Sequence, residues 1–258
     1  MDRTLIVIPV FNEEATLARV LTEVRRTAPD ADVLVVDDGS TDRSPEILAA
    51  RRDIRMIRHE ENRGYGQSLI TGFEDAIARD DHVVVTIDCD DQHEPRRIPA
   101  FRNAVTRADI VSGSRYLDPS VPGDPPPPDR WQLNQEITAL IRAVTGYAIT
   151  DSWCGFKAYR VEGLRKLALT EPSYGMPLQV WVQGAFHGLT VNELPVARIY
   201  KNPNRRLLPE APRTRGRALA ARAAAAAQVC TVCTVCTVYL TLKLCRLCRL
   251  CRLCRLQL

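Results

Sequence analysis

Residues 82–93 read HVVVTIDCDDQH, an apolar run followed at once by acids. The run from His82 to Ile87 is typical of a buried strand in a parallel sheet, and ligands of such sheets bind where the strands end. Asp88 and Asp90 form a D-x-D there, which could hold a hard divalent cation and, through it, a diphosphate. The alternative is an acidic turn that caps the next helix. Asp91 adds a third carboxylate, and the three repel one another unless a cation lies among them.

Strand-like and helix-like stretches alternate along the chain, which requires right-handed crossovers and a mostly parallel sheet flanked by helices. The sequence therefore predicts an α/β fold. The expected strands are 5–10, 33–36, 54–58, 83–87, 110–112 and 157–160, the expected helices are 14–27, 44–51, 67–79, 96–107, 130–145 and 178–186, and 191–200 is a last extended segment.

Composition is that of a globular protein with one sizeable domain, since 45% of the 258 residues are hydrophobic and 26% are charged. The net charge of +4 is too small to argue for a nucleic-acid partner. A strand begins at about Thr4, so we expect no signal peptide and a cytoplasmic protein. Only Cys89 and Cys154 lie outside the last 29 residues, which also favours a reducing compartment.

Two segments depart from the alternating pattern. Residues 118–129 hold six prolines and predict a long loop, either a functional lid or a stiff surface excursion. Residues 211–258 are Ala-rich and then repeat Val-Cys-Thr and Cys-Arg-Leu. Residues 223–242 are uncharged and long enough to span a bilayer, but rich in Ala, Thr and Cys, and the tandem Cys repeats match zinc sites poorly. We expect a domain at 1–210 and a low-complexity tail that is disordered or weakly membrane-associated.

Acidic residues also follow the first two expected strands, at 12–14 and 37–42. Because the carboxyl ends of parallel strands share one edge of the sheet, these acids should face the same crevice as Asp88 and Asp90. Carboxylates suit the hydroxyls of a ribose and the N–H edge of a base. The G-x-G-x-x-G of a dinucleotide site does not follow the first strand, and a P-loop is absent.

The motifs at 8–14 (IPVFNEE), 36–42 (VDDGSTD) and 62–66 (NRGYG), with the D-x-D, resemble the inverting family 2 glycosyltransferases of GT-A fold. Those at 112–116 (SGSRY) and 151–160 (DSWCGFKAYR) look like the polyprenyl-phosphate sugar transferases, the group that includes the dolichol-phosphate mannose synthases. The resemblance runs from about residue 4 to residue 200. It implies transfer of mannose or glucose from a GDP- or UDP-sugar to a polyprenyl phosphate, with Mg²⁺ or Mn²⁺, at the cytoplasmic face of the membrane.

By position, the resemblance implies that Pro9, Phe11, Glu13 and Asp38 hold the nucleoside. Asp88, Asp90 and Gln92 would hold the metal, and Asp88 and Gln92 would also contact the diphosphate. The family usually has a small residue where this chain has Asp91, whose carboxylate would either strengthen metal binding or point away.

Three further residues would carry catalysis. Arg115 and Arg130 match positions implied to contact phosphates, although a structural ion pair is the more frequent fate of an arginine. Asp151 would border the reaction centre and orient the acceptor or the sugar hydroxyls, because a lipid phosphate is already ionised and needs no strong base.

The family's closing Arg-Gly-Ser-Lys motif is not reproduced. Lys201 falls on its arginine, and Lys201 and Arg205 are the candidates for supplying its charge to a phosphate. Two alternatives remain open: a family 2 transferase with a glycan or small metabolite as acceptor, and a nucleotide-sugar-binding protein without turnover.

Overall fold

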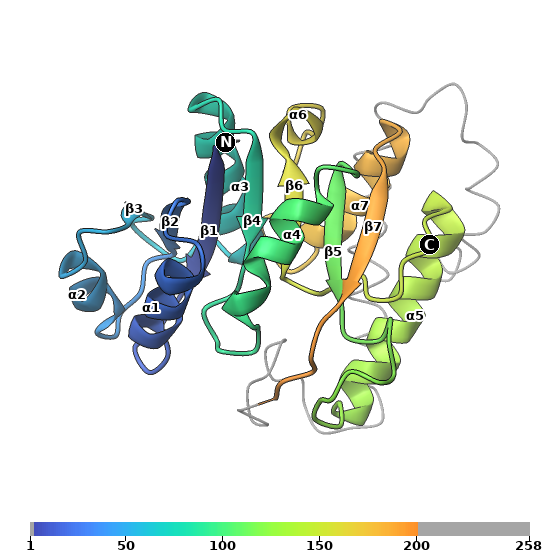
Figure 1. Ribbon diagram of the computed structural model, residues 1–258, viewed down its shortest axis with the longest axis horizontal. Helices are drawn as coiled ribbons and strands as arrows, with labels where there is room; N and C mark the ends of the chain where they lie inside the picture. Colours follow the sequence, from blue (N-terminus) through green and yellow to red (C-terminus); the bar gives the residue numbers. More distant parts are fainter. Residues whose placement is uncertain (1–2, 201–258) are drawn as a thin grey trace, which may run out of the picture. The chain divides into compact units, whose positions relative to one another are not determined.

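The computed structural model describes residues 3–200, in which the strands form one mixed sheet (Figure 1). The strands are β1 (Thr4–Val10), β2 (Asp32–Asp37), β3 (Arg55–Arg58), β4 (Val83–Thr86), β5 (Ile110–Ser114), β6 (Lys157–Arg160) and β7 (Val191–Pro195). Their order is β3-β2-β1-β4-β6-β5-β7, and only β6 runs antiparallel to its neighbours. The predicted mostly parallel α/β sheet is confirmed.

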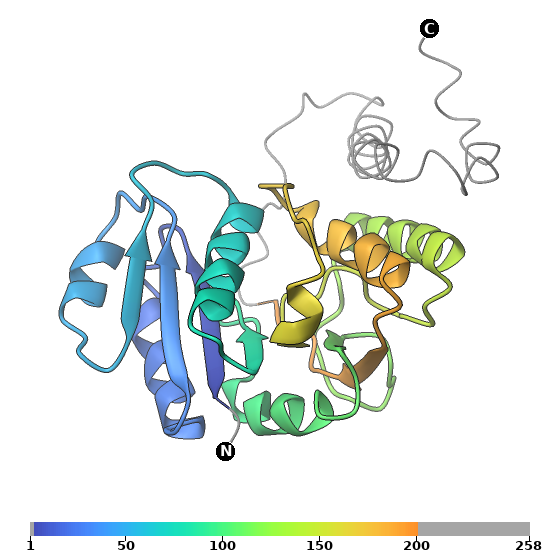
Figure 2. The ribbon, with the colours of Figure 1, turned by 90° about the horizontal axis from the view of Figure 1, so that it is seen from above.

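Helices cover both faces of the sheet, with α1 and α4 on one face and α3 and α7 on the other (Figure 2). The helices are α1 (Leu17–Thr27), α2 (Ser44–Ala49), α3 (Tyr65–Ala78), α4 (Ile98–Ala104), α5 (Pro128–Thr145), α6 (Val161–Leu164) and α7 (Met176–Phe186), and a 3₁₀ turn, η1 (Pro95–Arg97), precedes α4.

β1 shows why this sequence folds in this way. All seven of its residues are buried, so alternate side chains enter the two layers. Ile6 and Ile8 join the core that α1 and α4 complete, whereas Val7 meets α3. The helix comes so close that a β-carbon on Gly72 would lie 2.4 Å from Val7 Cγ1, which leaves no room for a larger residue.

Several predicted boundaries were wrong by two residues or more, including the following four. The first helix starts at Leu17 and not at residue 14, because Asn12 has a left-handed φ of 57° and the next residues are tied to the loop after β2. The segment 96–107 is a 3₁₀ turn followed by a shorter helix. Helix α5 begins inside the proline run, at Pro128, because the first turn of a helix needs no N–H donor. The strand expected over 191–200 ends at Pro195.

The pairing of β1 with β4 ends early, at Val7 and Thr86, followed by one hydrogen bond from Ile87 N to Val7 O. Pro9 lies two residues further on the same side of β1, where its missing N–H leaves no gap in a ladder. The sheet is therefore open between β1 and β4 at their carboxyl ends, at the lower edge in Figure 1. The D-x-D follows β4 at this edge.

The predictions for residues 201–258, including the domain boundary near 210 and the low-complexity tail, lie outside the described residues. Within residues 3–200, no helix has the length and apolar character needed to cross a membrane.

Candidate active site

Asn12 joins the loops that follow β1 and β2. Its side-chain oxygen accepts hydrogen bonds from the backbone N–H groups of Thr41 (2.8 Å) and Asp42 (3.3 Å), and its own N–H donates to Ser40 Oγ (3.0 Å). These bonds fix the residues on either side of Asn12. Phe11 exposes 43% of its surface beside them, as a nucleoside contact would require.

Glu13 is held in the same loop. Its backbone N–H donates to Ser44 Oγ at 3.0 Å, and its Oε2 accepts from Thr16 Oγ1 at 3.2 Å. The structure thus places Pro9, Phe11 and Glu13 together at the end of β1, and their contact with a nucleoside stays a prediction.

Asp38, 3% exposed, is engaged with the protein itself. Its Oδ1 lies 2.6 Å from His59 Nδ1 and accepts the N–H of Arg63 at 2.9 Å, and its Oδ2 accepts the N–H of Gly64 at 2.8 Å. His59 Nε2 lies 3.0 Å from Thr71 Oγ1. Asp38 therefore shapes the turn that leads into α3, and its predicted role towards the nucleoside stays untested.

Asp88 is held from three directions. Tyr65 donates its hydroxyl to Oδ1 at 2.9 Å, and His93 Nε2 lies 3.0 Å from Oδ2. A β-carbon on Gly155 would lie 2.2 Å from Oδ2, so the turn after Asp151 lies directly against the carboxylate. Burial would raise the pKa of Asp88, but His93, Tyr65 and the charge of Lys157 outweigh it and lower the pKa, so Asp88 is ionised.

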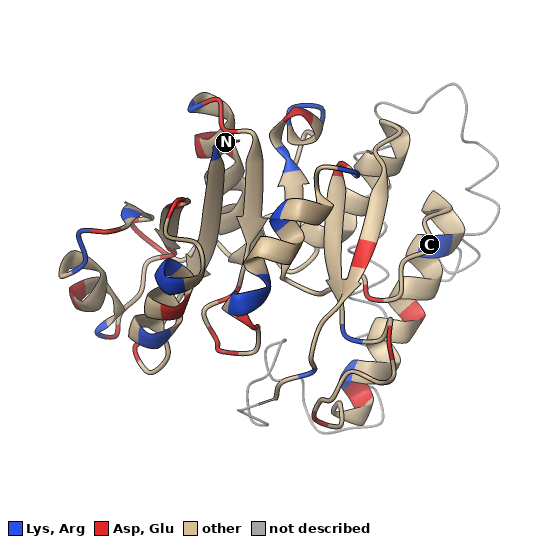
Figure 3. Cartoon of the chain, viewed as in Figure 1, with Lys and Arg blue, Asp and Glu red and all other residues tan. Residues whose placement is uncertain are grey.

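The other acids of the motif have separate partners, on a loop that Figure 3 shows to be acidic at the lower edge of the sheet. Asp90 Oδ1 accepts the N–H of Gln92 at 3.1 Å, which closes a tight turn. Asp91 has a left-handed φ of 61° and pairs with Arg19 Nη1 of α1 at 2.6 Å. The sequence left two alternatives for Asp91, which were stronger metal binding or a carboxylate that points away. In the structure the Asp91 carboxylate points to Arg19 of α1.

Asp151 and Arg115, predicted as separate catalytic residues, form one ion pair, in which the Asp151 side chain is buried and the Arg115 side chain is 20% exposed. Arg115 donates Nε to Oδ2 at 2.6 Å and Nη2 to Oδ1 at 2.9 Å, and Asn134 donates to Oδ1 at 2.8 Å. Burial would raise the pKa of Asp151, but Arg115 and Asn134 reverse this and lower it. A carboxylate with a lowered pKa is a weak base, in keeping with an orienting role.

Arg130 lies in the first turn of α5, one helical turn before Asn134. Residues four apart share a helix face, so Arg130 lies on the same face of α5 as Asn134, which contacts Asp151. Arg130 therefore lies one helical turn from a residue that contacts Asp151, and its catalytic role stays a prediction. Lys201 and Arg205 lie outside the described residues.

Lys157 was not singled out by the sequence. It is 2% exposed, donates Nζ to the carbonyl of Cys154, and lies 5.5 Å from the ring centroid of Trp181. Burial lowers its pKa, while the charges of Asp151 and Asp88 act in the other direction. Lys157 thus holds, through the carbonyl of Cys154, the turn that contacts Asp88.

Glu193 of β7 also went unnoticed. It accepts the N–H and hydroxyl of Thr150 at 2.8 and 2.7 Å, and the N–H of Asp151 at 3.2 Å. No sequence signal marked it, because these partners lie over 40 residues away. Tyr65, in contrast, lies inside the quoted motif at 62–66 and was the missed residue nearest to a signal. His93, next to the D-x-D, was considered from the sequence either as a ligand or as a residue that only supports the ligands, and the structure shows it against Asp88 Oδ2.

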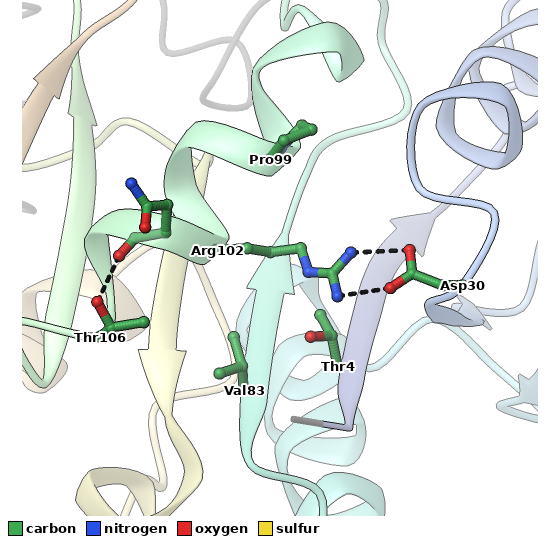
Figure 4. Close-up of a pocket in the computed structure, with 7 residues that line it drawn as sticks. Thr4, Asp30, Val83, Pro99, Arg102 and Thr106 are labelled. Carbon is green, nitrogen blue, oxygen red and sulfur yellow. Dashed lines mark hydrogen bonds and ion pairs between the residues drawn. The ribbon is translucent and has the colours of Figure 1, made fainter. Parts of the chain in front are cut away.

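A separate hollow lies at the other edge of the sheet (Figure 4). It is lined by Thr4 and Val83, the first residues of β1 and β4, and by Asp30, Pro99, Arg102, Asn103 and Thr106. Arg102 and Asp30 close one side with hydrogen bonds of 2.9 and 2.8 Å. Since ligands of such sheets bind at the carboxyl ends, we assign this hollow no part in the site.

Residues 5–168 match the family model for glycosyl transferase family 2, a range that includes Asp38, Asp88 and Asp151. The chain belongs to glycosyltransferase family 2. This result confirms the resemblance inferred from the motifs.

Two relatives within this family are informative. The chain is 31% identical over 204 residues to an undecaprenyl-phosphate mannosyltransferase of Micrococcus luteus, covering 75% of this chain and 82% of the relative. It is 31% identical over 207 residues to a polyprenol monophosphomannose synthase of Mycolicibacterium smegmatis, covering 76% and 77%.

A solved structure shares the fold. Glucosyl-3-phosphoglycerate synthase from Mycobacterium tuberculosis, in complex with Mn²⁺, uridine diphosphate and glucosyl-3-phosphoglycerate, superposes with a TM-score of 0.64. The match covers 90% of this chain and 80% of that chain, at 18% identity. At this identity the likeness supports the GT-A fold alone.

Proposed function

We propose that this chain transfers a hexose, with inversion, from a nucleotide-sugar to a polyprenyl phosphate. The observation that carries the proposal is the extent of the match. It includes both the D-x-D of Asp88 and the Asp151 turn. One of the two relatives is named as an undecaprenyl-phosphate mannosyltransferase and the other as a synthase of polyprenol monophosphomannose.

The side chains of the motif fit a hard divalent cation, Mg²⁺ or Mn²⁺. Asp88 is ionised, and each of its oxygens accepts one hydrogen bond and keeps lone pairs for a ligand. Within residues 3–200, no three His, Cys, Asp or Glu side chains converge as a metal group. Two carboxylates completed by phosphate oxygens and water are the donor set that Mg²⁺ prefers. When bound, the cation supplies positive charge to the departing diphosphate.

The protein's own groups would position the reactants. Asp88 and Asp90, with Gln92 beside them, would hold the metal–diphosphate end of the donor, and Phe11 and Glu13 would hold its nucleoside. Asp151, fixed by Arg115 and Asn134, would orient the acceptor or the sugar hydroxyls. A phosphate nucleophile is ionised near neutral pH, so in-line alignment and charge compensation would supply most of the rate.

The acceptor implies the place of action. A polyprenyl phosphate keeps its phosphate at the membrane surface, so we propose that the enzyme works at the cytoplasmic face of a membrane. Co-sedimentation with vesicles that contain polyprenyl phosphate, compared with vesicles that lack it, tests this part. Equal recovery of the protein in both supernatants would contradict it.

The function is tested by incubating the full chain with polyprenyl phosphate, MnCl₂ and a panel of labelled UDP- and GDP-sugars. We expect label from at least one donor to enter the organic phase, and Asp90→Ala to abolish this transfer. An arm with 3-phosphoglycerate in place of the lipid tests a water-soluble acceptor. Label that reaches only the water-soluble product would overturn the lipid acceptor.

A further inference from the structure

Tyr65 links two parts of the molecule that are distant in sequence. It is the first residue of α3, and its hydroxyl donates to Oδ1 of Asp88, 23 residues away, at 2.9 Å. His93 contacts the other oxygen at 3.0 Å. Together the two contacts fix the plane of the carboxylate, since one holds each oxygen.

Tyr65 is itself held by Tyr174. The two rings stack with centroids 5.2 Å apart and planes within 16° of parallel. The carbonyl of Tyr174 accepts the indole N–H of Trp153 at 3.2 Å, and its side chain remains 43% exposed. Tyr174 therefore lies between Trp153, in the turn after Asp151, and Tyr65, which contacts Asp88.

The segment that carries Tyr174, residues 168–175, is anchored at several points. Gln179 Oε1 accepts the N–H groups of Thr170 and Glu171 at 2.9 and 3.0 Å. Gln67 of α3 donates its N–H to the carbonyl of Pro172 at 3.0 Å.

The start of α3 is matched to this segment by two glycines. A β-carbon on Gly64 would lie 2.4 Å from the carbonyl oxygen of Pro172, and one on Gly66 would lie 2.4 Å from that of Glu171. Larger residues at either position would separate the helix from the segment. The position of Tyr65 is thus determined by packing on both sides.

We propose that Tyr65 is a positioning residue for Asp88, and that Tyr174 holds Tyr65 in place for this task. The inference rests on the proposed function, in which Asp88 is a metal ligand. A carboxylate whose two oxygens each accept a hydrogen bond is held in one orientation, so its remaining lone pairs point in fixed directions. When one of these hydrogen bonds is lost, the carboxylate of Asp88 can rotate, and its orientation towards the metal is no longer set before the metal binds. Loss of a partner that orients a metal ligand typically costs about 10–100-fold in metal affinity or activity.

The test measures Mn²⁺ binding from the electron paramagnetic resonance signal of free Mn²⁺, with UDP or GDP present. We expect Tyr65→Phe, which keeps the ring and its stack, to weaken binding by about tenfold or more. Tyr174→Ala removes an exposed ring and should weaken binding by about two- to tenfold. Tyr147→Phe is the matched control, because it loses one hydrogen bond, from its hydroxyl to Leu189 O at 2.7 Å, away from the site.

A positioning role also predicts a split in kinetics. Tyr65→Phe should raise the Mn²⁺ concentration for half-maximal transfer while kcat at saturating Mn²⁺ stays near that of the unchanged protein. Its Tm should lie at or somewhat below that of Tyr147→Phe, because Tyr65 loses a hydrogen bond to a charged carboxylate and Tyr147 loses one to a neutral carbonyl. If Tyr65→Phe and Tyr174→Ala both bound Mn²⁺ as tightly as the unchanged protein, the positioning role of Tyr65 would be overturned and the metal site would stand. Equal Mn²⁺ binding by the unchanged protein and Asp90→Ala would overturn the metal site, and the inference with it.

Discussion

Gly155→Ala is the substitution for which the structure makes the sharpest prediction. The new β-carbon would lie 2.2, 2.7 and 2.8 Å from Oδ2, Cγ and Oδ1 of Asp88, so one of the two residues must move. If Asp88 swings away, it loses the hydrogen bonds to Tyr65 and His93, each worth about 1.5–3 kcal/mol to a charged group. If the turn moves instead, overpacking costs about 1–3 kcal/mol.

The second route is cheaper, so we expect the free energy of unfolding to fall by about 1–3 kcal/mol, or the Tm by about 2–12 °C. Either route displaces the Asp88 carboxylate relative to the turn. We therefore expect Mn²⁺ affinity and sugar transfer to fall by at least about tenfold at a temperature where the variant is folded.

The assay pairs thermal unfolding with Mn²⁺ titration and transfer of labelled sugar to polyprenyl phosphate. Gly163→Ala is the control, because a β-carbon there would meet Leu189 Cδ1 at 3.5 Å, an ordinary contact. It should change neither the Tm, nor the Mn²⁺ affinity, nor the transfer rate. If Gly155→Ala kept the Mn²⁺ affinity and transfer rate of the unchanged protein, Asp88 would not be the ligand that the turn holds.

Three further substitutions test neighbouring charges. Asp91→Asn removes a pair with the half-exposed Arg19, so we expect unfolding free energy to change by less than about 1 kcal/mol and Mn²⁺ binding to persist; loss of Mn²⁺ binding would make Asp91 a ligand. Asp151→Asn leaves the Arg115 cation unpaired and should cost about 3–5 kcal/mol. Folding lowers the pKa of Asp151 below its ordinary 3.8, so the stability that the pair contributes is present above pH 3.8 and is lost as the pH falls further. The difference in Tm between the unchanged protein and Asp151→Asn should therefore become smaller in acid, and a difference that became larger would refute the pairing. Lys157→Met leaves the buried carbonyl of Cys154 without its donor, so the free energy of unfolding should fall by about 1–3 kcal/mol. The turn against Asp88 loses this support, so transfer should fall by about tenfold or more, and unchanged transfer would show that Lys157 only packs.

The core of the fold could be predicted because its strands are buried on both faces. β1, β2 and β4 read as short apolar runs ending in acids, so their order along the chain and their shared edge follow from local pattern. β6 was found as a strand, but its antiparallel insertion between β4 and β5 was not predicted. Strand order depends on tertiary packing, which four residues do not encode locally.

The site could be predicted to the level of which residues lie near one another. Asp88, Asp90 and the acids after β1 and β2 do meet at one edge, as the parallel topology requires. Which groups contact each other could not be foreseen. Arg115 pairs with Asp151 across 36 residues and Arg19 with Asp91 across 72, and such pairings leave no periodic signal in the sequence.

We propose that this chain transfers a hexose, without its phosphate, to a polyprenyl phosphate. The most direct measurement is mass spectrometry of the lipid and chromatography of the nucleotide after one incubation with the preferred donor. We expect a lipid heavier by one hexose residue and release of a nucleoside diphosphate. An unchanged lipid with every donor, or release of a nucleoside monophosphate, would contradict it.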